Sequence, residues 1–235
     1  MPGGAHLFHA ESGRRRFLQT VLSSATVAVA AQTGLELADS EKSGALASRS
    51  PETAFQELVA GNRRFAANQL TSIEHDLDIL KKQTADKQEP FAAILACADS
   101  RVPVELIFDQ TIGRLFVARV AGNIVTPEII ASLEYSVAVL GVRAVVVLGH
   151  SNCGAVKAAM KADPVPGQIS TLYPHLQRAV EQSGGNLEQA IKANTQIQAQ
   201  LLRNSSTVIR DALNLGNLKV EAAVYDLASG SVSLT

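Results

Sequence analysis

The chain has 235 residues, of which 46% are hydrophobic, and its 21 basic and 22 acidic side chains leave a net charge of −1. That length allows one domain with a substantial core and an additional tail. The balanced charge, without a block of lysines and arginines, argues against a nucleic-acid partner.

The first 31 residues have the pattern of a targeting segment. Arg14 and Arg15 precede an apolar stretch at 21–31, in which Ala28 and Ala30 supply the small residues that a signal peptidase recognises. The stretch is shorter than the roughly 20 apolar residues that span a bilayer, so we expect no stable membrane insertion. The segment resembles a twin-arginine export signal, which implies delivery to the periplasm. A disordered basic tail or a weak membrane anchor is the alternative.

The next segment, 32–50, is polar and rich in small residues, and we expect it to be a linker. A helix is predicted over 50–69, because apolar side chains recur there at helical spacing, Ser50 can cap it and Pro51 suits its first turn. The folded domain is therefore expected to span 51–235.

Three apolar runs of strand length follow, and we expect each to be buried on both faces, as in a parallel sheet. They lie at 91–97, 114–120 and 143–149. Helices are predicted at 126–141, after Cys153, at 170–182 and at 186–214, and the segment 219–235 is predicted to form a strand and a hairpin around Gly230. Strands that alternate with helices indicate an α/β fold, with a mainly parallel central sheet flanked by helices.

The two cysteines, Cys97 and Cys153, are the only ones in the chain. An exported protein with two cysteines invites one disulfide. Each cysteine, however, ends or closely follows an apolar run and has polar reactive neighbours, which a disulfide would leave unexplained. The twin-arginine route carries folded cargo, so a metal could be loaded in the reducing cytoplasm before export. We therefore favour a metal site over a disulfide.

The predicted strands place a third potential metal ligand near the cysteines. Cys97 ends one apolar run and His150 directly follows another, and functional residues of parallel sheets gather beyond the carboxyl ends of the strands. If the two strands are neighbours, Cys97, His150 and Cys153 converge on one point. Two thiolates and one imidazole suit a tetrahedral Zn²⁺, one per chain, with a fourth position left for water. For His150 alone, a hydrogen-bonded histidine at a strand end is the alternative.

The segments "CADSRVP" and "GHSNCGAV", together with "RVAGNIV" and "AVYDLASGSV", resemble those of a β-class carbonic anhydrase, from about Pro51 to the C-terminus. The resemblance implies the fold of that family and zinc ligated by Cys97, His150 and Cys153. It implies reversible hydration of CO₂ to bicarbonate and a proton, by a zinc-bound hydroxide. It also implies a homodimer or a higher even oligomer, because the active sites of the family lie at a subunit interface.

Asp99 and Arg101 follow the first ligand and resemble a catalytic pair of the family. A carboxylate beside the metal can select and orient the hydroxide, and a bidentate bond from Arg101 would hold Asp99 ionised. An ordinary loop salt bridge, or a cap on a helix after Pro103, is the alternative.

Five further residues resemble the substrate pocket of the plant-like subtype, whose zinc site is open at rest. Gln88 stands nine residues before Cys97, where that subtype has a glutamine that contacts substrate. A small apolar wall with one amide donor suits CO₂, which has no dipole. Core packing is the alternative for two members of this set, Phe116 and Tyr135. The candidate substrate-binding residues are Gln88, Phe116, Ala121, Tyr135 and Gly154.

Three other functions are compatible with parts of the pattern. A zinc hydrolase of the same architecture would act on CS₂ or carbonyl sulfide, and only the shape of its access channel would differ. A zinc-stabilised binding module without catalysis would fill the fourth metal position with another Cys or His rather than leave Asp99 beside Arg101. A dithiol redox protein would need a closely spaced cysteine pair, which the sequence lacks.

Overall fold

The computed structural model describes residues 49–75 and 77–235. The predicted export signal at 1–31 and all but the last two residues of the predicted linker lie outside this part of the chain. Among the helices that are described, none is both long and apolar enough to cross a membrane.

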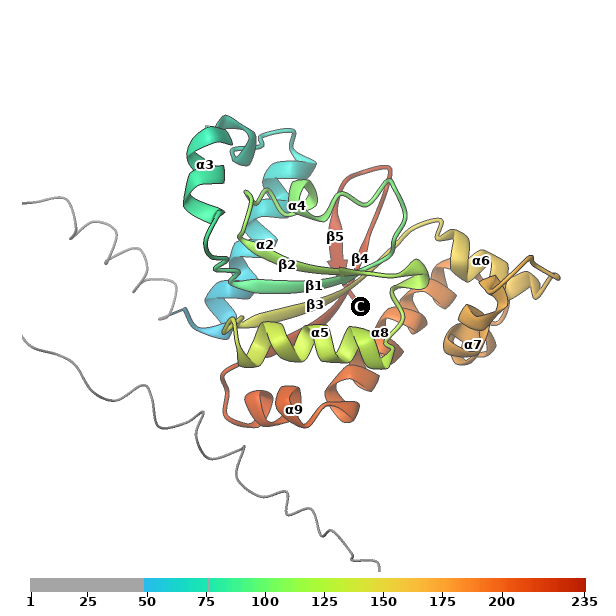
Figure 1. Cartoon of the computed structure of the whole chain (residues 1–235). Coiled ribbons are helices and arrows are strands. Elements are labelled where there is room, and N and C mark those ends of the chain that lie inside the picture. The colour runs from blue at the N-terminus through green and yellow to red at the C-terminus, as the bar shows by residue number, and fades with distance from the viewer. Residues whose placement is uncertain (1–48, 76) are drawn as a thin grey trace, which may run out of the picture. The chain divides into compact units, whose positions relative to one another are not determined.

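The centre of the domain is a five-stranded sheet with the order β2-β1-β3-β4-β5 (Figure 1). Its first four strands are parallel, and the short β5 runs antiparallel to β4. The α/β fold with a mainly parallel sheet is therefore confirmed. The strands are β1 (Ala92–Ala96), β2 (Leu115–Arg119), β3 (Ala144–His150), β4 (Lys219–Tyr225) and β5 (Val232–Leu234).

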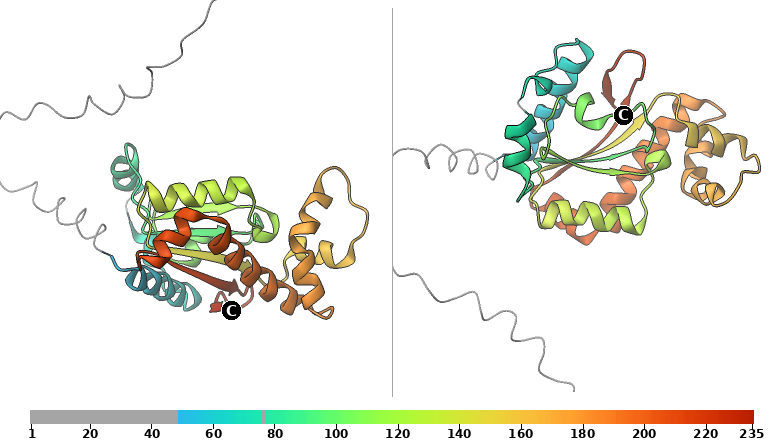
Figure 2. Two further views of the ribbon diagram at one scale, coloured as in Figure 1. Left: turned by 90° about the horizontal axis from the view of Figure 1, so that it is seen from below. Right: turned by 45° about the horizontal axis from the view of Figure 1, so that its top comes forward.

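Helices cover both faces of this sheet (Figures 1 and 2). Helices α2 and α4 pack on one face, whereas α5, α8 and α9 pack on the other. Helices α6, α7 and α8 surround the carboxyl end of the strands. The helices are α2 (Pro51–Ala66), α3 (Leu77–Thr84), α4 (Val104–Ile107), α5 (Pro127–Ala138), α6 (Gly154–Lys161), α7 (Tyr173–Gln182), α8 (Leu187–Ser205) and α9 (Thr207–Asn214), with 3₁₀ turns η1 (Ser72–Glu74), η2 (Ala121–Asn123) and η3 (Ile169–Leu172).

The helix boundaries follow the capping residues. Ser50 accepts a hydrogen bond from the Thr53 N–H at 3.1 Å, as the N-cap of α2, and so confirms the predicted start. The predicted single helix at 186–214 is wrong, because Ser206 interrupts it. The Ser206 hydroxyl accepts from the Ile209 N–H at 3.0 Å and thereby begins α9 as a separate helix.

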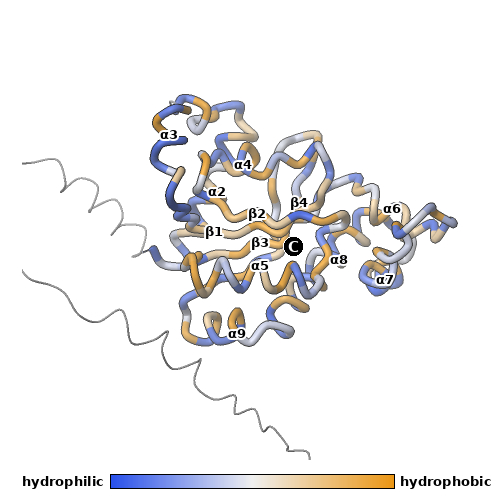
Figure 3. Tube along the Cα trace, viewed as in Figure 1, coloured by the Kyte–Doolittle hydropathy of each residue, from blue (hydrophilic) through white to orange (hydrophobic). Residues whose placement is uncertain are grey.

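The burial of the strands differs between the centre and the edge of the sheet. Every residue of β1 and β3 is buried, and both strands are mainly apolar (Figure 3), with the polar His150 only at the end of β3. The expectation of full burial is wrong for β2, in which Leu115, Phe116 and Val117 are only half-buried. The reason is that β2 is an edge strand, so no further strand flanks its outer side.

One buried side chain joins the first helix of the domain to its last strands. Asn62 of α2 donates to the carbonyls of Ile107, at 3.1 Å, and Gly230, at 2.9 Å. Its side-chain oxygen accepts from the Val232 N–H at 2.8 Å. The predicted turn at Gly230, which has a φ of 76°, is thereby fastened to α2.

Candidate metal centre

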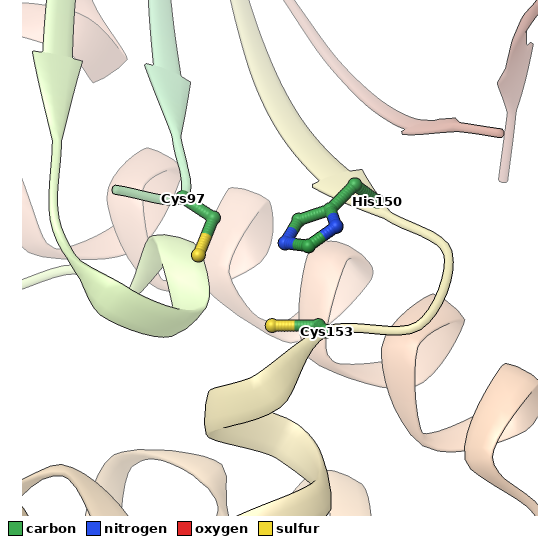
Figure 4. A group of neighbouring side chains, drawn as sticks. All are labelled: Cys97, His150 and Cys153. Carbon is green, nitrogen blue, oxygen red and sulfur yellow. The ribbon is translucent and has the colours of Figure 1, made fainter. Parts of the chain in front are cut away.

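Three metal-ligating side chains converge beyond the carboxyl ends of β1 and β3. Cys97 directly follows β1, His150 is the last residue of β3, and Cys153 directly precedes α6. Since β1 pairs with β3 in parallel, the predicted neighbourhood of the two strands is confirmed. One ligand atom from each residue lies within 4.8 Å of the other two, and the three side chains point toward one another (Figure 4).

The histidine of this group presents a bare nitrogen to the two cysteines. Nδ1 of His150 lies 3.0 Å from the carbonyl oxygen of Ser151. A carbonyl can only accept, so Nδ1 carries the proton and Nε2 carries the lone pair. Nε2 is buried and has no hydrogen-bond partner. A buried nitrogen without a partner is costly, and a metal ion would satisfy it.

The two thiols fit the same ion. Both cysteines are free and buried. A hydrogen bond from the Cys153 thiol, helped by the Gly122 N–H at 3.3 Å from Cys97 Sγ, lowers the pKa of Cys97 to about 4. The same contact raises the pKa of Cys153, so the pair gives up its first proton easily and its second only with difficulty. A bound cation would stabilise both thiolates, and two thiolates with one imidazole form a ligand set that suits zinc.

The predicted pair of Asp99 and Arg101 lies at the rim of this centre. Nε and Nη2 of Arg101 donate to the two carboxylate oxygens of Asp99 at 2.9 and 2.8 Å, and the Arg101 N–H donates at 2.9 Å. The side-chain bond from Arg101 lowers the pKa of Asp99 below its usual range, so the carboxylate is ionised at neutral pH. Its Oδ2 lies 3.8 Å from His150 Nε2.

Sequence reasoning missed an arginine that fixes this rim from β2. Nε of Arg119 donates to the Cys97 carbonyl at 3.0 Å, and Nη2 donates to the Asp99 carbonyl at 2.6 Å. Arg119 therefore fixes the backbone of the ligand Cys97 and of Asp99. The available signal was its position, one residue before the end of the apolar run at 114–120.

Sequence reasoning also missed the support under Cys97. Gly122, in the turn η2, directs its N–H at the sulfur with a φ of 76°, a conformation that favours glycine. The buried amides of Asn194 and Gln198, on α8, bond to the backbone of η2 and its surroundings. No sequence motif marks these residues, because backbone donors leave no pattern of side chains.

Two of the five predicted substrate residues lie next to the metal centre. Ala121 begins η2, directly before Gly122, and Gly154 directly follows Cys153. Gly154 is exposed, and a methyl group added there would meet no atom within 4 Å. The surface beside the ligands is therefore open, and these two residues on it are small.

The other three lie away from the metal centre of their own chain. Gln88 is exposed in the loop before β1, at the end of the strand opposite to Cys97. Phe116 pairs with Ala93, so it lies about 13 Å along the strands from the ligand end. The ring of Tyr135, 46% exposed, packs 6.4 Å from that of Phe116. Within one chain, these three side chains do not join the ligands.

Known proteins with this pattern were found by sequence and by structure. A family model described as carbonic anhydrase matches residues 92–232. Carbonic anhydrase 2 of Mycobacterium tuberculosis is 32% identical over 192 residues, which cover 78% of this chain and 92% of that protein. The carbonic anhydrase of Pseudomonas aeruginosa is 38% identical over 170 residues, which cover 65% of this chain and 76% of that protein.

Two solved structures show the same arrangement of the chain. The β-carbonic anhydrase CcaA superposes with a TM-score of 0.62 at 27% identity, over 77% of this chain and 94% of that one. A structure from a study of two tetrameric β-carbonic anhydrases of the ascomycete Sordaria macrospora superposes with a TM-score of 0.63 at 26% identity, over 77% of this chain and 95% of that one.

Proposed function

The chain belongs to the β-class carbonic anhydrase family, and from this membership we propose that it hydrates CO₂ reversibly to bicarbonate and a proton. We propose that each chain holds one zinc ion through Cys97, His150 and Cys153. The observation that carries this proposal is the buried, unpartnered His150 Nε2 placed with the two sulfurs, all within 4.8 Å.

The chemistry divides between the ion and the chain. Zinc, when bound, lowers the pKa of a water molecule so that hydroxide is available as a nucleophile near neutral pH. The ionised carboxylate of Asp99 can accept a hydrogen bond beside the ligands and so orient the nucleophile. Arg101 holds that carboxylate by two parallel bonds, which restrict its rotation. Burial of the ligands excludes competing water from the thiolates.

We propose that the site belongs to the open, plant-like subtype, with Asp99 bound to Arg101 rather than to the metal. The bidentate pair supports this proposal, since it occupies both carboxylate oxygens. Replacing Arg101 by Ala should free Asp99 to bind the metal, lower turnover at pH 7 and leave the zinc content unchanged. Arg101→Lys keeps the charge but not the planar fork, and should give an intermediate rate. A structure at neutral pH with an Asp99 oxygen within about 2.2 Å of zinc would contradict the open site.

We also propose that the active unit is at least a dimer in which one chain completes the pocket of the other. Gln88, Phe116 and Tyr135 lie on one chain far from its own ligands, on or near the exposed edge of β2, which supports a shared pocket. The relatives from Sordaria macrospora are described as tetrameric, which supports a dimer of dimers as the larger assembly.

Mixing two defective variants tests the shared pocket. Gln88→Ala should bind zinc but turn over slowly, and Cys153→Ala should lose zinc and activity. A mixed dimer combines an intact metal centre with an intact Gln88 across one interface, so refolding the two variants together should restore part of the activity. Activity no higher than the sum of the separate variants would show that each pocket is built from one chain.

The central experiment is a CO₂ hydration assay on purified protein, before and after removal of metal by a chelator. We expect about one zinc per chain, loss of activity with the metal, and recovery when zinc is returned. Hydrolysis of CS₂ or carbonyl sulfide without CO₂ hydration would assign the chain to the related hydrolases. Full activity and stoichiometric zinc in Cys153→Ala would disprove the ligand assignment.

We further propose that residues 1–31 direct export to the periplasm through the twin-arginine route. The support is the sequence pattern alone, with Arg14 and Arg15 before the apolar stretch. Replacing both by Lys should retain an uncleaved precursor in the cytoplasm. Arg16→Lys, which keeps charge and length but spares the pair, is the matched control. Unimpaired periplasmic delivery of the double variant would refute the proposed route.

A further inference from the structure

Two buried amides on α8 lie beneath the metal centre, and the chemistry proposed above gives them no direct part. Asn194 and Gln198 are each 1% exposed and lie four residues apart, so they share one face of the helix. Burial of an amide costs free energy unless its donors and acceptors are satisfied. The bonds that satisfy these two amides lead to the metal centre.

Gln198 is the anchor of the pair. Its Oε1 accepts from the Val125 N–H at 2.8 Å, just after the turn η2. Its Nε2 donates to the His175 carbonyl and to Asn194 Oδ1, each at 3.1 Å. The latter bond fixes the orientation of the Asn194 amide, because its Oδ1 is engaged and its Nδ2 is left to donate elsewhere.

Asn194 carries the connection to the turn. Its Nδ2 donates to the Gly122 carbonyl at 2.9 Å, while the Gly122 N–H donates to Cys97 Sγ at 3.3 Å. One of the two peptide groups that flank Gly122 is thus bonded to the sulfur and the other to Asn194. Gly122 has a φ of 76°, and glycine has many alternative conformations, so these external bonds select the one that directs the N–H at sulfur.

We propose that Asn194 and Gln198 are positioning residues for the Cys97 sulfur. They act through Gly122, whose N–H takes up part of the negative charge of a metal-bound thiolate. This inference rests on the zinc centre of the proposed function. Partners in the outer shell of metal sites typically change metal affinity or activity by about 10- to 100-fold when they are removed.

A purely structural role would give a different result, and Thr195 provides the matched control. Thr195 is fully buried on the same helix, but its hydroxyl donates only to the Ile191 carbonyl of that helix, at 2.8 Å. Thr195→Ala therefore removes one buried hydrogen bond from α8 without touching η2 and without adding bulk against Gly149, the residue before the ligand His150. Asn194→Leu removes the bond to Gly122 at similar side-chain size.

The test uses the full chain and two measurements other than turnover. Zinc affinity is measured by competition with a chromophoric chelator, and the thiolate charge-transfer absorption is recorded after substitution with Co²⁺. For Asn194→Leu we expect zinc affinity to fall about 10-fold or more and the absorption to shift, because one thiolate has lost its N–H donor. Thr195→Ala should match the wild type in both measurements.

The outcomes separate this inference from the proposed function. If wild-type protein binds no zinc, the proposed function fails and this inference fails with it. If wild-type protein binds zinc but Asn194→Leu has the same affinity and absorption, only the inference is overturned. An equal loss in Thr195→Ala would also overturn it, since general weakening of α8 would then be the cause. If Asn194→Leu does not fold, Gln198→Met provides the test. This variant keeps Asn194 but removes the bond that orients the Asn194 amide. An unchanged Co²⁺ charge-transfer absorption in Gln198→Met would overturn the inference.

Discussion

Gly149, directly before the ligand His150, is expected to be the most size-sensitive position in β3. A methyl group at this residue would overlap Oγ1 of Thr195 on α8. Its next neighbours, Ile191 Cγ2 at 3.5 Å and Thr195 Cβ at 3.6 Å, are at ordinary contact distance. Gly149→Ala should therefore force Thr195 to move and break its bond to the Ile191 carbonyl.

The expected cost follows from two opposing contributions. Overpacking of a core typically costs about 1–3 kcal/mol. Replacing glycine by alanine in extended backbone returns about 0.4–1 kcal/mol, because the unfolded chain loses freedom. The net loss, up to about 2.6 kcal/mol, should lower the melting temperature by about 2–4 °C per kcal/mol for a domain of this size. Thermal unfolding of zinc-loaded protein at one fixed concentration measures it.

A second substitution tests whether the contact with Thr195 causes this loss of stability. Thr195→Ala removes the overlapping oxygen, so adding Gly149→Ala in that background should be neutral or stabilising by up to about 1 kcal/mol. The two changes should thus be strongly non-additive. A Gly149→Ala protein as stable as the wild type, or a double variant whose loss equals the sum of the single losses, would show that the contact is not limiting.

Two further expectations concern acid stability and thiol chemistry. Burial would raise the pKa of Asp109, but hydrogen bonds from the Ser72 N–H and the Arg64 side chain outweigh it and lower that pKa. The contribution of this carboxylate to stability is therefore complete above its unfolded pKa of about 3.9 and lost as the pH falls toward the folded value. The melting-temperature difference between wild type and Asp109→Asn should shrink between pH 6 and pH 3, and a constant difference would contradict this. Thiol labelling of the folded, zinc-loaded protein should leave Cys97 and Cys153 unmodified until a chelator is added, whereas a mass lower by two hydrogens under non-reducing conditions would reveal a disulfide.

The parts of the fold that sequence predicted are those in which side chains carry the signal. The apolar runs that end in Cys97 and His150 predicted β1, β3 and the convergence of the ligands, because parallel neighbours share one carboxyl edge. Ser206 was present as a capping signal, but the helical periodicity on both sides of it concealed the break.

What sequence could not predict depends on contacts between distant segments. The edge position of β2 follows from strand order, which hydrophobicity does not encode. The bond from Gly122 to Cys97 is made by a backbone N–H, and the amide that orients Gly122 lies 72 residues away at Asn194. Such bonds exist only once the helices have packed, so no local sequence pattern predicts them.

The three bonds of Asn62 also bear on the order in which the domain is completed during synthesis. Asn62 and its partner Gly230 are 168 residues apart. At about 5–20 residues per second, the ribosome makes Asn62 roughly ten to thirty seconds before Gly230 and Val232. Until then, α2 lacks two of the bonds that hold this buried amide. A nascent chain that stops short of residue 230 should therefore present α2, with the apolar side chains of Phe55 and Leu58, as a surface that chaperones can bind.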